Sequence, residues 1–291
     1  MNRQISLIVT DFDNTLYDWV VMWYEAFSAM MDQLIAKSGV PRHTLETELQ
    51  TVFQRHGTSE YAFIIEELPS LRSKHPNEDL TVVYQDAIKA YSIARQSSLQ
   101  LYPGVRETLE KLKNIGCMIV AFTESMEFYT MPRLKKLGLD GVLDYVYSPP
   151  DHAKPLDFAR QYDDDWYRLQ HTVQRFIPAE ARKPNPDILL SIIGDDGIHA
   201  TKEHTIYVGD SLMKDVKMAQ DAGVIDVHAK YGTAVHTKAY DVLRRVTHWT
   251  KEDVEREKMI LAGGKVTPTF VMERSFEELL SFFDFIPHER V

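Results

Sequence analysis

The segment from Leu7 to Leu16 places the strictest limit on how this chain folds. It opens with Leu-Ile-Val-Thr, an apolar and β-branched run that is typical of a buried strand in a parallel sheet. The run ends at two carboxylates, Asp11 and Asp13. In open α/β sheets, ligands bind just beyond the carboxyl ends of the strands. Taken alone, the pair is equally compatible with an acidic turn that bonds to its own backbone.

The alternation of strands and helices from Leu101 onward indicates the fold class. Short apolar runs predict further strands, which are expected at 117–122, 143–147, 204–208 and 224–229. Helical patterns separate these runs, and this alternation is typical of a doubly wound parallel sheet in an α/β fold. We therefore predict an α/β core that consists of residues 1–16 and 99–291.

The residues between the first strand and this alternation have a different pattern. Apolar residues recur at three- and four-residue steps from Trp19 to Ile35, which predicts a long helix that ends at Gly39-Val40-Pro41. Further helical segments are expected at 44–55, 61–67 and 80–95. We predict a second, smaller, all-helical domain of residues 17–98, with the Met and aromatic stripe as its core.

Two later regions are harder to assign. The connection 148–178 is longer than usual and is treated as an insertion within the core. Apolar residues step at three and four within it and predict a helix; they are Tyr162, Trp166, Leu169, Val173 and Phe176. Beyond Ala229 the pattern predicts helices at 238–245, 251–261 and 275–283 and a strand at 269–272, and it assigns no role to 236–268.

Composition excludes several classes of function. The 43 acidic and 33 basic residues give a formal net charge of −10, which argues against binding to a nucleic acid polymer or an anionic membrane. The single cysteine, Cys117, cannot form an intramolecular disulfide. The N-terminal residues lack a signal-peptide pattern, and no apolar run reaches membrane-spanning length. We expect a cytoplasmic protein. The sequence is compatible with a homo-oligomer as well as with a monomer.

Polar side chains gather at the ends of the other predicted strands as well. Together with Asp11 and Asp13 they form the candidate site, namely Thr123, Glu124, Ser125, Lys183, Asp210 and Asp215. Several carboxylates at one sheet edge repel one another unless a cation lies among them, and hard oxygen ligands favour Mg²⁺. A lysine and a hydroxyl beside that metal suggest a phosphate. One carboxylate could attack phosphorus while its neighbour transfers the proton.

The four motifs resemble those of the haloacid dehalogenase-like superfamily. They are Asp11-Phe12-Asp13-Asn14-Thr15, Val120-Ala121-Phe122-Thr123, Lys183-Pro184-Asn185-Pro186 and Gly209-Asp210-Ser211-Leu212-Met213-Lys214-Asp215. The resemblance covers residues 5–16 and 101–230, and the helical segment resembles the cap domain of that family.

The resemblance implies a role for each residue. Asp11 would be the nucleophile that forms an aspartyl-phosphate, and Asp13 the general acid and base. Asp11, the backbone carbonyl of Asp13 and Asp210 would hold Mg²⁺, while Thr123 and Lys183 would bind the phosphoryl oxygens. Asp215 would support the site. Further candidates for phosphate contact are the backbone N–H groups of Phe12, Asn14, Glu124 and Ser125, and Thr15 and Ser211 would give local support or act as caps.

The position of the lysine has an alternative. Lys154-Pro155 follows the predicted strand 143–147 at a shorter distance, where the family often has its lysine. We favour Lys183 because Pro184 and Pro186 lead directly into an apolar helix, whereas Lys154 opens the polar insertion.

We therefore predict a Mg²⁺-dependent phosphomonoesterase that acts on a small phosphorylated metabolite, such as a nucleoside monophosphate or phosphoglycolate. An acid at Asp13 argues against the dehalogenases and phosphonatases of the family. A sugar-phosphate mutase or phosphotransferase would use the same motifs. A non-catalytic binding protein on this fold is the other alternative, and the intact acids and lysine argue against it.

Overall fold

The computed structural model describes residues 3–151, 168–178, 181–233, 237–249 and 266–289. The chain forms two compact units. The first comprises Met1–Asp18, Gln100–Thr233 and Gly264–Val291, and the second comprises Trp19–Leu99 and Ala234–Gly263. The first unit carries every residue of the candidate site.

The first unit is built on a parallel sheet, as predicted. Among the described residues the sheet has seven strands, in the order β5 (Val173–Phe176), β4 (Tyr145–Ser148), β3 (Met118–Phe122), β2 (Leu7–Thr10), β6 (Thr205–Gly209), β7 (Ile225–Ala229) and β8 (Phe270–Met272). The chain runs outward from β2 in both directions, first through β3, β4 and β5 and later through β6, β7 and β8. The order reverses beside β2, and such a switch point is where doubly wound sheets bind ligands. A short parallel pair, β1 (Gln4–Ile5) with β9 (Asp284–Phe285), was not predicted.

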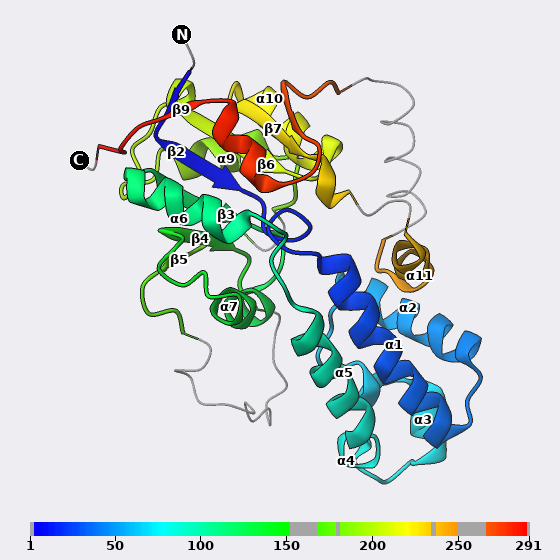
Figure 1. The fold of residues 1–291 in the computed structure, drawn as a ribbon. Helices are drawn as coiled ribbons and strands as arrows, with labels where there is room; N and C mark the ends of the chain where they lie inside the picture. The colour runs from blue at the N-terminus through cyan, green and yellow to red at the C-terminus, as the bar shows by residue number, and fades with distance from the viewer. Residues whose placement is uncertain (1–2, 152–167, 179–180, 234–236, 250–265, 290–291) are drawn as a thin grey trace. The chain divides into compact units, whose positions relative to one another are not determined.

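Alternating side chains on each strand bury both faces of the sheet. On one face, Leu7 and Val9 of β2 join a buried cluster with α9 (Pro186–Ile193) and α10 (Lys217–Ala222). The helix α6 (Val105–Ile115) lies in front of the sheet in Figure 1 and α9 lies behind it. Further helical elements of this unit are α7 (Glu127–Lys136), η2 (Lys202–His204), the π-helical turn η3 (Leu212–Val216), η4 (Lys230–Gly232) and η5 (Phe276–Ser281).

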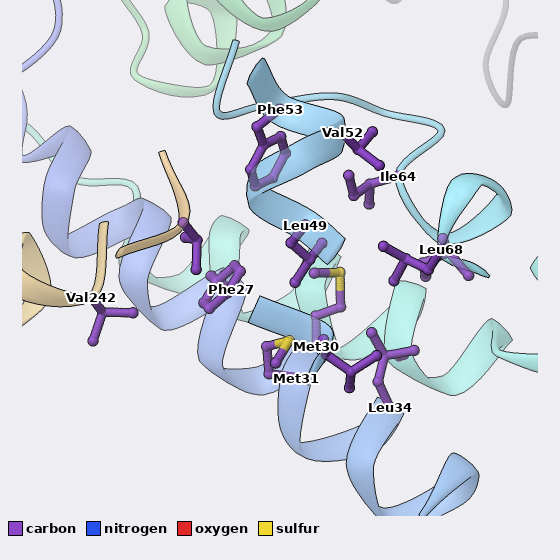
Figure 2. Packing of buried hydrophobic residues seen from close by; sticks show 14 of the residues in the cluster. Phe27, Met30, Met31, Leu34, Leu49, Val52, Phe53, Ile64, Leu68 and Val242 are labelled. Atoms are coloured by element: carbon purple, nitrogen blue, oxygen red, sulfur yellow. The ribbon is translucent and has the colours of Figure 1, made fainter. Parts of the chain in front are cut away.

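All the secondary structure in the described residues of the second unit is helical. Its elements are α1 (Trp19–Ser38), α2 (Arg42–His56), η1 (Ile65–Glu67), α3 (Pro69–Lys74), α4 (Leu80–Val83), α5 (Gln85–Ser98) and α11 (Lys238–Val246). Figure 2 shows the apolar stripe of α1, including Phe27, Met30 and Leu34, packed against Leu49 and other buried residues. The stripe is core, as the sequence analysis inferred.

The helix α11 belongs to a different unit from the one predicted from the sequence. The residues after 99 were assigned to the α/β core, whereas α11 packs with the helical unit. Val242, Leu243 and Val246 of α11 belong to the same buried cluster as the α1 stripe. The physical reason is that α11 is strongly amphipathic and buries its apolar face against α1 and α2.

Two predictions of secondary structure were wrong. Val173 and Phe176, expected on a helix, lie on the edge strand β5, which pairs with β4. The expected helix 275–283 is the shorter 3₁₀ helix η5. The predicted helix 251–261 and the rest of the helix predicted within 148–178, apart from Leu169, lie outside the described residues. Within the described part of the chain, no helix combines the length and hydropathy needed to cross a membrane.

Candidate active site

The register of the sheet explains why distant motifs meet. Thr10 pairs with Ala121 of β3 on one side and with Val208 of β6 on the other. Two residues beyond each pairing, the chain reaches Phe12, Thr123 and Asp210. The carboxyl ends of three neighbouring strands therefore deliver the three motifs to one place. Asn185, two residues after Lys183, caps α9 by accepting a hydrogen bond from the Ile188 N–H.

Lys183 lies between two carboxylates. Its Nζ donates to Oδ1 of Asp11 and, at 3.0 Å, to Oδ1 of Asp215. The Lys183 side chain is 2% exposed, and those of Asp11 and Asp215 are 11% and 3% exposed. The structure thus brings together one lysine and two acids that are far apart in sequence. The alternative lysine, Lys154, lies outside the described residues.

Asp215 is fixed from several directions. Besides Lys183, the Tyr207 hydroxyl donates to Oδ1 and the Ser211 N–H donates to Oδ2, both at 3.0 Å. Gly209 leaves the space that this carboxyl group needs, since a Cβ at Gly209 would lie 2.3 Å from Cγ of Asp215. This glycine is therefore a steric requirement of the site.

The site carries more negative than positive charge. Burial raises the pKa of Asp11 to about 7 even though Lys183 opposes the shift, and Asp215 and Asp13 raise it further. Burial, together with Asp215 and Asp11, also raises the pKa of Asp210 well above its ordinary range. Burial alone would lower the pKa of Lys183, but Asp11 and Asp215 raise it well above its ordinary value. Lys183 is therefore a permanent cation.

Three of these acids fit a metal ion. One carboxylate oxygen from each of Asp11, Asp210 and Asp215 lies within 4.8 Å of the others. Hard oxygen ligands and an uncompensated negative charge are what Mg²⁺ requires. Burial and the neighbouring carboxylates raise the pKa values of Asp11 and Asp210 despite Lys183, and a divalent cation among these acids would offset their repulsion. The donor set therefore fits the expected cofactor, and it includes the Asp215 carboxylate, which was expected only to support the site.

The Asp13 carboxylate is held by hydroxyl groups. Tyr17 donates to Oδ1, while Thr123 and Ser125 donate to Oδ2 at 3.2 and 2.5 Å. Nη1 of the buried Arg133 lies 3.8 Å from Oδ1. Asp13 thus faces a different set of groups from Asp11.

The end of β7 and the loop after it contact the motifs that carry Asp11 and Asp210. Tyr231 donates to the Thr15 carbonyl oxygen at 2.7 Å, and His228 Nε2 lies 3.0 Å from the Asp210 carbonyl oxygen. Gly232 packs so closely on the first of these motifs that a Cβ there would lie 1.7 Å from the Asn14 carbonyl oxygen. Asn14 has a positive φ of 57°, and Thr15 Oγ1 donates to Asp11 Oδ2 at 3.3 Å.

We expect Gly232→Ala to lower kcat by about 10²-fold, because the Cβ must displace the loop that carries Asp11 and Asp13. Steady-state kinetics at saturating Mg²⁺ measures this effect. Gly194→Ala is the matched control, since Gly194 likewise has no positive φ and a Cβ there meets only the Leu190 carbonyl oxygen, at 3.4 Å. Equal kinetics for the two variants would contradict the proposed close packing.

Several contacts of the site were not identified from the sequence. Tyr207, Arg133, Lys214, His228 and Tyr231 each reach a predicted site residue through a side chain. Tyr207 lies on a strand that was predicted, but periodicity alone does not say that its hydroxyl faces Asp215. The others follow from packing between elements, which leaves no local pattern in a sequence.

Residues 5–223 match the family described as haloacid dehalogenase-like hydrolase. The chain belongs to this family. The match spans all four motifs and confirms the resemblance seen in the sequence. The protein is accordingly a hydrolase of the haloacid dehalogenase-like class.

Curated relatives of this hydrolase are phosphatases. The chain is 28% identical over 236 residues to the phosphoglycolate phosphatase of Nitrosococcus oceani, which covers 80% of this chain and 87% of that protein. It is 24% identical over 231 residues to the glyceraldehyde 3-phosphate phosphatase of Methanopyrus kandleri, covering 78% and 85%.

Solved structures of the family have the same fold. A Thermotoga maritima protein described as a candidate beta-phosphoglucomutase has a TM-score of 0.54 and 17% identity, with 95% of this chain and 97% of that chain covered. The HAD-hydrolase YfnB of Bacillus subtilis, bound to magnesium, has a TM-score of 0.50 and 15% identity, with 96% and 98% covered. At these identities the likeness shows the fold alone, and the predicted fold class is confirmed.

Proposed function

We propose that this hydrolase is a Mg²⁺-dependent phosphomonoesterase that works through a phosphorylated Asp11. The observation that carries the proposal is Lys183, a buried cation bonded to both Asp11 and Asp215 at the switch point of the sheet. A fixed cation beside a carboxylate suits the transfer of a phosphoryl group, whose charged oxygens need neutralisation. The three clustered carboxylates supply a place for the metal.

The chemistry divides between the two acids. Oδ of Asp11 would attack phosphorus and break the ester P–O bond, while Asp13 gives a proton to the leaving oxygen. Asp13 would then take a proton from water as that water attacks phosphorus, which breaks the bond to Asp11 and releases phosphate. Mg²⁺, held by Asp11, Asp210 and Asp215, would neutralise the phosphoryl oxygens. The hydroxyls of Tyr17, Thr123 and Ser125 keep Asp13 in place for both proton transfers.

The substrate class is a small phosphomonoester. Relatives named phosphoglycolate phosphatase and glyceraldehyde 3-phosphate phosphatase support a phosphorylated two- or three-carbon compound. A nucleoside monophosphate is the other candidate from the sequence. A sugar-phosphate mutase would need the same acids and lysine, so the assay has to distinguish transfer from release.

Phosphate release from phosphoglycolate, glyceraldehyde 3-phosphate, nucleotides and sugar phosphates, with and without Mg²⁺, tests the proposal. We expect release from at least one of these compounds, and loss of release when Mg²⁺ is chelated. No release from any compound would contradict the proposal. Interconversion of glucose phosphates without net release would favour the mutase.

The pKa of Asp11 predicts how the metal stabilises the fold. Its value of about 7 lies above the ordinary 3.8, so between these values the folded, metal-free protein binds a proton that the unfolded chain does not. The stability from this proton is fully present below the ordinary pKa and is lost as the pH rises through about 7. Mg²⁺ takes the place of the proton, so it should raise the Tm more at about pH 8 than at about pH 5.5. Thermal unfolding at both pH values measures this; an equal or larger gain at the lower pH would count against the metal site.

A further inference from the structure

Glu124 joins three segments of the site through one carboxyl group. It follows Thr123 at the end of β3. Its Oε1 accepts the backbone N–H of Lys183 at 3.0 Å, and its Oε2 accepts Nζ of Lys214 at 2.6 Å. Lys214 belongs to η3, which also carries Asp215. From the sequence, only the backbone of Glu124 was expected at the phosphate, and no role was predicted for its side chain.

The pair is ionised. Burial alone would raise the pKa of Glu124, but Lys214 and Lys183 lower it below its ordinary value. Burial likewise acts to lower the pKa of Lys214, and Glu124 more than offsets this effect. A charged acceptor holds a backbone N–H more firmly than a neutral one does. Glu124 therefore anchors the backbone from which the Lys183 side chain extends.

This anchor matters because a lysine side chain is long and flexible. Nζ of Lys183 has to reach both Asp11 and Asp215, and the position of its backbone limits where Nζ can lie. Glu124 also adds a negative charge beside a site that must accept a phosphate dianion. Lys214 offsets that charge at a distance of 2.6 Å.

We propose that Glu124 is the positioning residue for Lys183 and that Lys214 neutralises Glu124 so that the site accepts a phosphate dianion. The proposal rests on the proposed phosphatase function. A purely structural ion pair would behave differently. Lys214 and Glu124 have side chains that are 47% and 22% exposed, and pairs at this exposure contribute little to stability. The structural alternative therefore predicts small effects on phosphate binding, of the same kind for both residues.

The test compares the wild type and its variants in their affinity for inorganic phosphate, measured in the presence of Mg²⁺. Lys214→Met leaves Glu124 uncompensated and should weaken phosphate binding by about 3- to 10-fold. Glu124→Gln keeps an oxygen for the Lys183 N–H but removes the charge, so it should tighten binding by about 2- to 5-fold. The double variant should return to within about twofold of the wild type. Lys217→Met is the control, because it breaks the similarly exposed Lys217–Asp221 pair on the neighbouring helix α10.

A second readout tests the anchor. Glu124→Ala removes the acceptor and should lower kcat by about 10-fold or more, while its Tm stays close to that of Lys217→Met. Shifts of phosphate affinity in the same direction for Lys214→Met and Glu124→Gln, or shifts no larger than in the control, would overturn the inference. A wild-type protein that binds phosphate but hydrolyses no phosphomonoester would instead contradict the proposed function. The two opposite shifts in affinity would still test the roles of Glu124 and Lys214 in that case.

Discussion

Asp11→Asn is expected to lower kcat by about 10³-fold or more, because the amide cannot act as the nucleophile. Asp11 is bonded to Lys183 and belongs to the group of acids that fits a metal. Asp215 shares both features, but its carboxylate is also held by the Tyr207 hydroxyl and the Ser211 N–H. The change removes one charge from a cluster with excess negative charge and leaves Lys183 paired with Asp215 at 3.0 Å. The variant should therefore fold, and its loss of activity should not reflect unfolding. Kinetics and thermal unfolding of the same sample measure both.

Asp195→Asn is the control for this variant. Asp195 is also an acid of the first unit, but its carboxylate lies 3.8 Å from Nε of Arg175 and belongs to no part of the site. We expect unchanged kcat for this variant. Retention of phosphate release by Asp11→Asn above about 10% of the wild-type rate would assign the nucleophile to another group.

Lys183→Met is expected to reduce both stability and activity. The change leaves Asp11 and Asp215 buried without their shared cation, and breaking a buried ion pair in this way costs about 3–5 kcal/mol. Mg²⁺ should recover part of the lost stability, because a cation among the carboxylates again offsets their repulsion. Thermal unfolding with and without Mg²⁺ measures the stability, and phosphate release measures the activity.

Lys217→Met serves again as the control, since it removes an exposed lysine whose ion pair is expected to contribute at most about 1 kcal/mol. A Lys183→Met protein as stable and as active as this control would mean that Lys183 is not the lysine of the site. Lys154 would then become the candidate, and Lys154→Met would be the next variant to measure.

The sequence was sufficient for the parts of the site that depend on strand ends. Asp11, Thr123 and Asp210 follow short apolar strands, and the parallel register of β2 with β3 and β6 brings them together. The same reasoning predicted the sheet, because buried parallel strands appear as continuous apolar runs. The helix α1 could be predicted equally well, because the apolar residues of its stripe repeat at the helical period.

The rest depends on contacts between elements that no local pattern records. β5 was mistaken for a helix because Val173 and Phe176 are three residues apart, a spacing that is also compatible with an edge strand whose side chains are partly exposed. α11 is amphipathic, but the sequence does not say which apolar surface its face covers. The hydroxyl groups around Asp13 and the contact between Glu124 and Lys214 likewise arise only when η3 and the segments that follow β2 and β3 are packed together.

The central claim is that Asp11 becomes phosphorylated during turnover. The most direct measurement is acid quenching of the protein during hydrolysis of a phosphomonoester labelled in its phosphoryl group, followed by mapping of the labelled peptide. The account predicts label on Asp11 that hydroxylamine removes and that is absent from Asp11→Asn. Phosphate release from the wild type with no label on Asp11, or with label on another residue, would contradict it.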